Sequence, residues 1–445
     1  MKLALQNEVA VSNDEVRQLD RAYVFHSWSM QGNLHPLVIA GAQGCELWDY
    51  EGNTWLDFSS QLVNVNIGYQ HPRVLAAMKA QLETLVTIAP ATANLARGEA
   101  AKRIVDLAPA GFSKVFFTNA GADANENAIR MARLYTGRDK VLSAYRSYHG
   151  NTGSAIAATG DWRRVPNEFS RGHIHFFNPY LYRSEFNAAT EEEECQRALA
   201  HLRRIIECEG PTAIAAILLE SIPGTAGILV PPAGYMQGVR ALADEFGIVL
   251  ILDEVMAGFG RTGSWFAFEQ DGVVPDLVTF AKGVNAGYVP AGGVLISEPI
   301  ARYFDDHFFA GGLTYSGHPL AMAAIVATID AMKEEKVVEN AAYIGNEVLR
   351  PGLEALAEKH AIIGEVRGRG LFQALELVSS REQKTPLTAA DMAAIKGALT
   401  EAGLLVFVVE NRIHVVPPCT ITAEQVAQGL AIFDAVFARF ASLAK

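Results

Sequence analysis

Residues 248–283 read IVLILDEVMAGFGRTGSWFAFEQDGVVPDLVTFAKG, a stretch in which two apolar runs each end in a charged side chain. The first run, IVLILDEV, ends at Asp253, and the second, DLVTFAKG, ends at Lys282. Runs that are apolar at successive positions are typical of parallel strands buried on both faces of a sheet. The stretch therefore predicts two buried strands whose carboxyl ends carry a carboxylate and an amine.

Predicted strands and helices alternate on both sides of this stretch, from about residue 60 to residue 320. The expected strands are SKVFFTN (113–119), KVLSAY (140–145), IAAILLESI (214–222) and GGVLISE (292–298). The expected helices include ADANENAIRMARLYTG (122–137) and GYMQGVRALADEFG (234–247). Strands that alternate with helices predict a doubly wound, mainly parallel α/β sheet.

The two ends of the chain predict a smaller α+β domain. The segment GCELWDYEGNTWLDF (44–58) alternates apolar and polar residues around a turn, which favours a hairpin. Near the other end, residues 388–403 predict a helix, LLVFVVENRIHVVPP (404–418) predicts two short strands, and a last helix begins at Ala423. We expect an N-terminal segment, 1–59, that joins the small domain, a large domain, 60–320, and a C-terminal small domain, 321–445.

Composition limits the classes of protein and of partner. Of the 445 residues 50% are hydrophobic, and the formal net charge is −12 without any basic block. An acidic chain of this kind is a poor binder of nucleic acid, so a small-molecule partner is expected. The most apolar stretch, 212–232, is interrupted by Glu220 and by prolines, and the segment 1–16 does not resemble a signal peptide. We therefore expect no membrane span.

The cysteines give no sign of a metal or redox site. They stand at positions 45, 195, 208 and 419, and no two of them form a C-x-x-C pair. A zinc site therefore has no support, and no metal is expected. So few thiols in a chain of this length favour a reducing cytoplasm over a disulfide-linked scaffold.

Three strand ends carry groups that could act together, because ligands of open α/β sheets bind at the carboxyl ends of strands. Strand 113–119 is followed by Ala120, Gly121 and Ala122 and then by a helix, an arrangement that suits one phosphate but could be a plain tight turn. Asp253 could be a helix cap, a metal ligand or the counter-ion of a buried cation. Lys282 could extend to solvent or be a nucleophilic amine of depressed pKa.

The three groups together suit pyridoxal phosphate. A lysine can form a Schiff base with the aldehyde, a carboxylate can hold the pyridine nitrogen protonated, and the glycine turn can hold the phosphate. The spacing around Gly121 is neither G-x-G-x-x-G nor G-x-x-x-x-G-K-[ST], so a nucleotide fingerprint is absent. An NAD-dependent dehydrogenase therefore remains only a less favoured alternative.

At this point the sequence resembles the class III pyridoxal-phosphate transaminases of the aspartate-aminotransferase-like fold, known as fold type I. The resemblance covers nearly the whole chain, and its most specific part is 252–294. Further matching segments are TNAGADANENAIRMAR (118–133), SYHG (147–150), LTYSGHPLA (313–321) and VRGRGLF (366–372). The resemblance implies a large domain with a mainly parallel sheet and a smaller α+β domain from the two ends of the chain.

The resemblance also implies the roles of the catalytic residues. Lys282 is expected to hold the cofactor as a Schiff base and then to move the proton between the substrate carbon and the cofactor. Asp253 is expected to pair with the pyridinium nitrogen. Gly121 and Ala122 are expected to bind the phosphate through their backbone N–H groups.

Three further positions are implied around the cofactor. Tyr148 is expected to stack on one face of the ring and Val255 to pack on the other, although either could be an ordinary interface or core residue. Thr314 is expected to reach the phosphate bound by a neighbouring subunit. A homodimer with shared active sites, possibly paired into a tetramer, would then be the catalytic unit. The turn at residues 260–263, Gly-Arg-Thr-Gly, is interpreted as structural.

The residues expected to select the substrate are less well defined. Many relatives carry an arginine where this chain has Phe407 or His414, so Arg412 is the candidate clamp for an acid group, with a surface arginine as the alternative. Val63 replaces a bulky aromatic and should open the pocket, which Trp28 should close. In the family, Glu220 lies near the cofactor and can pair with a substrate-binding arginine.

Segments 61–72 and 224–240 resemble the branch of taurine, β-alanine and ω-amino-acid transaminases. The expected activity is a ping-pong transamination from an ω-amino acid or primary amine, such as taurine, β-alanine or 4-aminobutyrate, to pyruvate or 2-oxoglutarate. The alternative is an aminomutase or an amino-acid racemase on the same scaffold, since these reactions also need Lys282.

Overall fold

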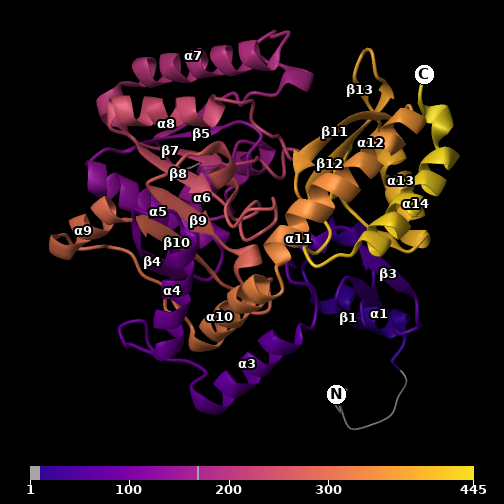
Figure 1. The fold of residues 1–445 in the computed structure, drawn as a ribbon, viewed down its shortest axis with the longest axis horizontal. Coiled ribbons are helices and arrows are strands. Elements are labelled where there is room, and N and C mark those ends of the chain that lie inside the picture. The colour runs from indigo at the N-terminus through magenta and orange to yellow at the C-terminus, as the bar shows by residue number, and fades with distance from the viewer. Residues whose placement is uncertain (1–10, 168–169) are drawn as a thin grey trace.

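The computed structural model describes residues 11–167 and 170–445 and contains a large sheet and two smaller ones (Figure 1). Most of the segment on which the signal-peptide prediction depends, residues 1–10, lies outside these ranges. Across the described ranges, no helix combines the length and the apolar character that crossing a membrane requires. The same ranges contain no group of three or more histidine, cysteine or acidic side chains that could hold a metal ion.

The large sheet has the strand order β4-β10-β9-β8-β7-β5-β6. Its strands are β4 (Phe112–Thr118), β5 (Lys140–Ala144), β6 (His173–Phe176), β7 (Ile214–Glu220), β8 (Val249–Asp253), β9 (Leu277–Phe280) and β10 (Gly292–Ser297). The strands from β9 to β6 run parallel, whereas β10 is antiparallel to both β9 and β4. The predicted α/β fold with a mainly parallel sheet is therefore confirmed.

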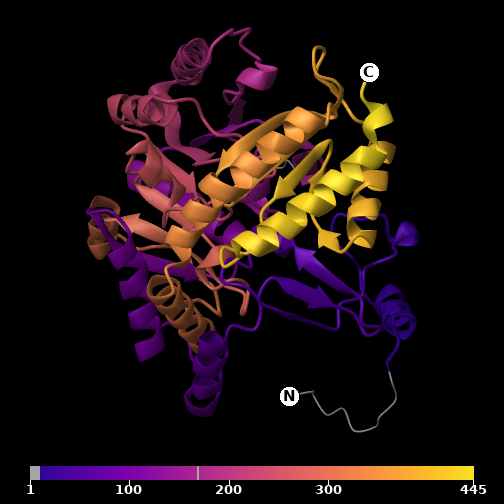
Figure 2. The same cartoon turned by 45° about the vertical axis from the view of Figure 1, so that its right-hand side comes forward.

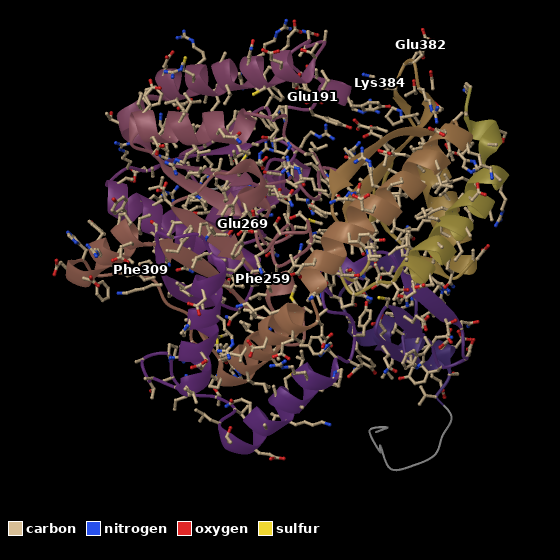
Figure 3. All side chains as sticks on the ribbon, in the orientation of Figure 1. Glu191, Phe259, Glu269, Phe309, Glu382 and Lys384 are labelled. Atoms are coloured by element: carbon tan, nitrogen blue, oxygen red, sulfur yellow. The ribbon has the colours of Figure 1, made fainter. Side chains whose placement is uncertain are left out.

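Helices cover both faces of the large sheet, which explains the continuous apolar runs of its strands. On one face, Val249 and Ile251 of β8 share a core with α5 (Gly121–Thr136) and α9 (Glu298–Asp306). On the other face, Leu250 and Leu252 join a core formed with α4 (Leu95–Leu107), α7 (Glu191–Glu209), α8 (Tyr235–Phe246) and α10 (Pro319–Glu334). Phe259, labelled in Figure 3, belongs to this second core, where its ring packs against Phe266 and Phe280.

A second sheet lies beside the large one and is built from C-terminal residues. Its order is β11-β12-β16-β15, with β11 (Ile363–Arg369), β12 (Phe372–Ser380), β16 (Arg412–Val415) and β15 (Phe407–Val409), and β13 (Thr385–Pro386) pairs with β12. Figure 2 shows α12 (Arg350–Lys359) and α14 (Ala423–Arg439) in front of it, and α13 (Ala389–Glu401) packs beside α14. Buried side chains such as Leu375, Ile413 and Phe433 form their common core.

The third sheet joins the two ends of the chain. The hairpin of β2 (Glu46–Trp48) and β3 (Thr54–Asp57) agrees with the prediction, and β1 (Gly41–Gln43) extends it. On the other side, β14 (Leu404–Leu405) runs parallel to β3, with Leu404 opposite Leu56. Segment 404–418 therefore forms three strands in two sheets rather than the two predicted, because the chain passes from one sheet to the other at the buried Val406.

Short elements complete the described chain. They are α1 (Asn13–Tyr23), α2 (Ser60–Val63), α3 (Pro72–Thr84), α6 (Gly153–Ala158) and α11 (Val337–Tyr343). The last one leads through a π-helical turn, Ile344–Leu349, into α12. Helix α2 is kinked, because Gln61 has a φ of 61° inside it.

Candidate active site

A cavity of about 550 Å³ opens at the carboxyl ends of β7 and β8 and the start of α5. Its lining includes seven of the residues singled out from the sequence, namely Gly121, Ala122, Tyr148, Glu220, Asp253, Val255 and Lys282. These residues come from five separate segments, so only the fold brings them together.

Asp253 ends β8, and three donors orient its buried carboxylate. Its Oδ2 accepts a hydrogen bond from Asn125 Nδ2 at 2.8 Å and lies 2.8 Å from His149 Nδ1, while its Oδ1 accepts the Val255 N–H at 3.0 Å. Thr279 Oγ1 in turn donates to Asn125 Oδ1 at 2.8 Å, which fixes that amide. These contacts orient the carboxylate, which lines the cavity.

Lys282 follows β9 and begins a short 3₁₀ turn, Lys282–Val284, with a φ of 40°. A positive φ is costly for a residue with a side chain, and such strain is concentrated at functional sites. Desolvation lowers the pKa of Lys282, although the charges of Asp253 and Glu220 partly oppose this effect. The amine is therefore easier to deprotonate than that of a surface lysine, as a nucleophile requires.

The start of α5 forms a compact cradle for an anion. Its N-cap, Ala120, offers no side-chain hydrogen bond, so the first N–H groups of the helix are not capped by it. A Cβ at Gly121 would lie 2.9 Å from Val255 Cγ2, and one at Gly150 would lie 2.5 Å from Ala122 Cβ. The start of α5 is therefore uncapped, and glycine allows neighbouring segments to approach it closely. Both features suit the binding of a phosphate group.

Tyr148 and Glu220 connect two loops at the rim of the cavity. The buried Glu220 carboxylate accepts the Tyr148 N–H at 3.0 Å and the Gly224 N–H at 2.7 Å. Desolvation raises the pKa of Glu220, and Asp253, its partner across the β7–β8 pair, adds to this effect. Within residues 11–167 and 170–445 Glu220 forms no ion pair with an arginine, so in this structure it holds loops in place.

A second cavity of about 400 Å³ adjoins the first and shares Tyr148 and Lys282 with it. Two more of the residues singled out from the sequence, Trp28 and Arg412, line it together with Arg146, Arg163 and Glu410. The Trp28 ring meets Tyr148 edge-on at 6.4 Å, and the Arg163 guanidinium lies 4.0 Å above the Tyr148 ring. The sequence predictions for Trp28, Tyr148 and Arg412 thus point to one connected space.

Val63 and Thr314 line neither cavity. The kink in α2 turns Val63 into a core with Met256 and Phe372, whereas the neighbouring Leu62 lines both cavities. Thr314 lies in an exposed segment. His414 is fully buried, and desolvation lowers its pKa to about 3, so it is neutral at physiological pH.

Three residues near the cavities had not been selected from the sequence. Asn125 could have been noticed as a polar side chain among the alanines of α5, and His149 as part of the SYHG segment. Arg146 precedes that segment by a single residue and had no signal of its own. The partners of these side chains become visible only in the tertiary structure.

The family model Aminotransferase class-III matches residues 28–437. The chain belongs to the class III aminotransferases. It is similar to the taurine–pyruvate aminotransferase of Bilophila wadsworthia, with 33% identity over 88% of each chain. It is also similar to the 4-aminobutyrate aminotransferase of Escherichia coli, with 35% identity over 91% of this chain and 94% of the relative.

Solved structures agree with this family. The taurine:2-oxoglutarate aminotransferase from Bifidobacterium kashiwanohense, solved with pyridoxal phosphate and glutamate, has a TM-score of 0.94 and 43% identity, covering 97% of this chain and 99% of the relative. An (S)-enantioselective ω-transaminase from Thermomicrobium roseum has a TM-score of 0.92 and 35% identity, covering 96% and 99%. This class III aminotransferase is therefore a pyridoxal-phosphate enzyme.

The residues of the first cavity fit that cofactor. The N-terminus of α5 offers N–H donors to a phosphate, Asp253 offers an oriented carboxylate to the ring nitrogen, and Lys282 offers an amine of lowered pKa. All three groups line the same 550 Å³ space.

Proposed function

We propose that this enzyme transfers an amino group from an ω-amino acid or a primary amine to pyruvate or 2-oxoglutarate by a ping-pong mechanism. Taurine, β-alanine and 4-aminobutyrate are the donors we favour, because the relatives named above act on taurine and 4-aminobutyrate. The observation that carries the proposal is the joined pair of cavities, in which Lys282 and Asp253 face the cofactor space and Arg412 lies in the adjoining one.

The chain's own groups divide the work of this reaction. Bound pyridoxal phosphate supplies an electron sink for the negative charge left when a substrate carbon loses its proton. Lys282 Nζ, whose pKa burial lowers, takes up that proton and returns it. Asp253, oriented by Asn125 and His149, would hold a proton on the ring nitrogen of the cofactor, and Tyr148 and Val255 would contact the ring.

The second cavity supplies the proposed substrate contacts. Arg412 binds the acid group of the substrate, and Trp28 covers the entrance. His414 cannot take the role of Arg412, because a neutral imidazole provides no charge to pair with an acid. Glu220 contributes by fixing the Tyr148 loop.

We further propose that the enzyme is a cytoplasmic homodimer, alone or paired into a tetramer, in which Thr314 binds the phosphate of the neighbouring active site. The exposure of Thr314, away from the cavities of its own chain, supports this assignment. The proposed domains are a large one of residues 60–320 and a small one of residues 321–445 together with the segment 1–59.

The visible absorption spectrum of the purified holoenzyme tests the activity. Taurine, β-alanine, 4-aminobutyrate, alanine, glutamate and 1-phenylethylamine are added singly, without a keto acid. We expect the band of lysine-bound cofactor to disappear with at least one acid-bearing donor, with release of its carbonyl product. Lys282→Ala should still bind the cofactor but lack the covalent bond that borohydride traps in the wild type, and it should lose turnover.

Three other outcomes would each contradict one part of the proposal. If an isomerised or epimerised amino acid forms without a carbonyl product, the enzyme is an aminomutase or a racemase rather than a transaminase. Retained turnover in Lys282→Ala would refute the role of Lys282. Failure to bind the cofactor even after reconstitution would refute the assignment of the first cavity.

A further inference from the structure

Arg146 is a half-buried cation that lines the second cavity, and within residues 11–167 and 170–445 it has no ion-pair partner. Its guanidinium donates one hydrogen bond, to the carbonyl oxygen of Ala226 at 3.2 Å, and lies 5.3 Å from the centre of the Tyr180 ring. Nowhere in the described chain does a carboxylate form an ion pair with it. Burial lowers the pKa of Arg146, and the nearby Arg412 adds to this effect. A guanidinium that is partly withdrawn from water is stabilised by a neighbouring anion, which a bound ligand can supply.

Arg412 reaches the same cavity from β16. Its side chain is 6% exposed, and its Nε has no hydrogen-bond partner. The two arginines therefore line one space, which Lys282 also lines. Arg163 differs from them, because Asp161 already pairs with it at 2.5 Å.

The turn at Gly227 seats these arginines. Its φ of 119° lies in the region that favours glycine, and a Cβ there would lie 2.4 Å from Arg412 Cδ. Its carbonyl oxygen accepts Arg367 Nε at 2.7 Å, and Arg367 is paired with Glu365 and Glu376. The positive charge of Arg367 is thus balanced inside the protein, whereas that of Arg146 is not.

Glu410 is the carboxylate that pairs with Arg412 in this structure. It lies in the tight turn between β15 and β16 with a φ of 52°, and its side chain is 69% exposed. The Arg412–Glu410 ion pair is 2.5 Å long. Because the Glu410 carboxylate is largely in water, releasing it buries no negative charge, and the buried Arg412 guanidinium then needs another anion in its place.

We propose that Arg146 and Arg412 together form the acid-binding end of the substrate channel, and that Glu410 is an internal counter-anion which the acid group of the substrate displaces from Arg412. The inference rests on the proposed function and specifies its substrate class. The preferred substrates carry a carboxylate or sulfonate at the end remote from the amine or keto group. Two guanidinium groups around one anion provide several charge-assisted hydrogen bonds.

Steady-state kinetics of the holoenzyme test Arg146 and Glu410, because substitutions of these two residues should change KM in opposite directions. With pyruvate as acceptor, Arg146→Gln should raise KM for β-alanine about tenfold or more, the loss of one charge-assisted hydrogen bond. Glu410→Gln should lower the same KM about threefold, because the competing internal anion is gone. The donor 1-phenylethylamine has no acid group and serves as the reference. The ratio of KM for β-alanine to KM for 1-phenylethylamine should rise in Arg146→Gln and fall in Glu410→Gln.

Matched controls and a second readout separate a lost contact from a damaged fold. Arg204→Gln and Glu401→Gln change exposed residues on α7 and α13 and should leave every KM unaltered. Arg146→Lys keeps the charge and should fall between Gln and the wild type. Calorimetric binding of propionate to each holoenzyme measures the anion site without turnover, and it should weaken in Arg146→Gln and strengthen in Glu410→Gln.

Equal changes of KM for β-alanine and 1-phenylethylamine in Arg146→Gln, or weaker propionate binding in Glu410→Gln, would overturn the proposal. Because the propionate measurement does not depend on amino transfer, it distinguishes a wrong clamp from a wrong reaction. An enzyme that binds propionate as expected but transfers no amino group would refute the proposed function and leave the anion site in place.

Discussion

Lys282 combines two features that a surface lysine lacks, a strained backbone and a desolvated amine. The positive φ fixes the direction in which its side chain leaves β9, and burial lowers its pKa. Both features are energetically unfavourable in the folded protein, and the surrounding core maintains them. Asp253 is held differently, since hydrogen bonds from Asn125 Nδ2 and the Val255 N–H fix the orientation of its carboxylate.

The lowered pKa of Lys282 predicts a pH dependence for the apoprotein. Attachment of pyridoxal phosphate requires the neutral amine, so its rate should rise with pH and reach a plateau below pH 10.5, the ordinary pKa of lysine. Stopped-flow absorbance after mixing apoprotein with the cofactor at a series of pH values measures this rate. A rate that continues to rise through pH 10.5 would show that the amine is not desolvated.

At the scale of single elements, the start of α5 depends on the absence of a side chain at Gly121. Adding one would bring a methyl group within 3 Å of Val255, which lines the same cavity. The close contact between a helix start and the loop after β8 is what places the phosphate cradle next to Asp253. The position therefore couples a backbone requirement to cofactor binding.

Gly121→Ala is expected to weaken cofactor binding about tenfold, because the contact with Val255 must be relieved by moving the helix start or the side chain. Val255→Ala removes the two methyl groups that would be hit, so the double variant should bind more tightly than Gly121→Ala alone. Fluorescence titration of the apoproteins with pyridoxal phosphate gives the four dissociation constants. Additive effects in this cycle would contradict a direct contact.

Elements were predictable from the sequence where local pattern decides the structure. The strands β4, β5, β7, β8, β9 and β10 form where predicted, because their short runs of mainly apolar residues favour strands in a sheet that helices cover. The kink at Gln61 and the division of 404–418 between two sheets could not be predicted, because both are set by packing against distant segments. For the same reason the sequence located Lys282 but not Arg146. Arg146 stands out only in the tertiary structure, where no carboxylate of the described residues forms an ion pair with it.

At the scale of the whole molecule, Arg261 connects the large sheet region to the other parts of the chain. This fully buried arginine donates to the carbonyl oxygens of Leu371 and Pro417 at 3.1 and 2.5 Å, and to Ser60 Oγ and Asn66 Oδ1 at 3.1 and 2.8 Å. The turn of residues 260–263 was interpreted as structural, and its arginine joins four separate segments.

Arg261→Met should lower the free energy of unfolding by about 3 to 5 kcal/mol, because buried carbonyl groups would lose their partners. Arg261→Lys should recover only part of this loss, since one ammonium group cannot reach all four acceptors. Urea denaturation followed by circular dichroism measures both. Equal stability of Arg261→Met and the wild type would show that these hydrogen bonds contribute no net stability.

The pairing of β14 with β3 has a consequence for the order in which the protein is made. Residues 41–57 leave the ribosome long before their parallel neighbour, Leu404–Leu405, is synthesised. Closing so long a loop is slow, and until it closes one edge of the early hairpin has no neighbouring strand. The nascent chain must therefore keep this edge from pairing wrongly until Leu404–Leu405 has been synthesised, a task for which chaperones are suited.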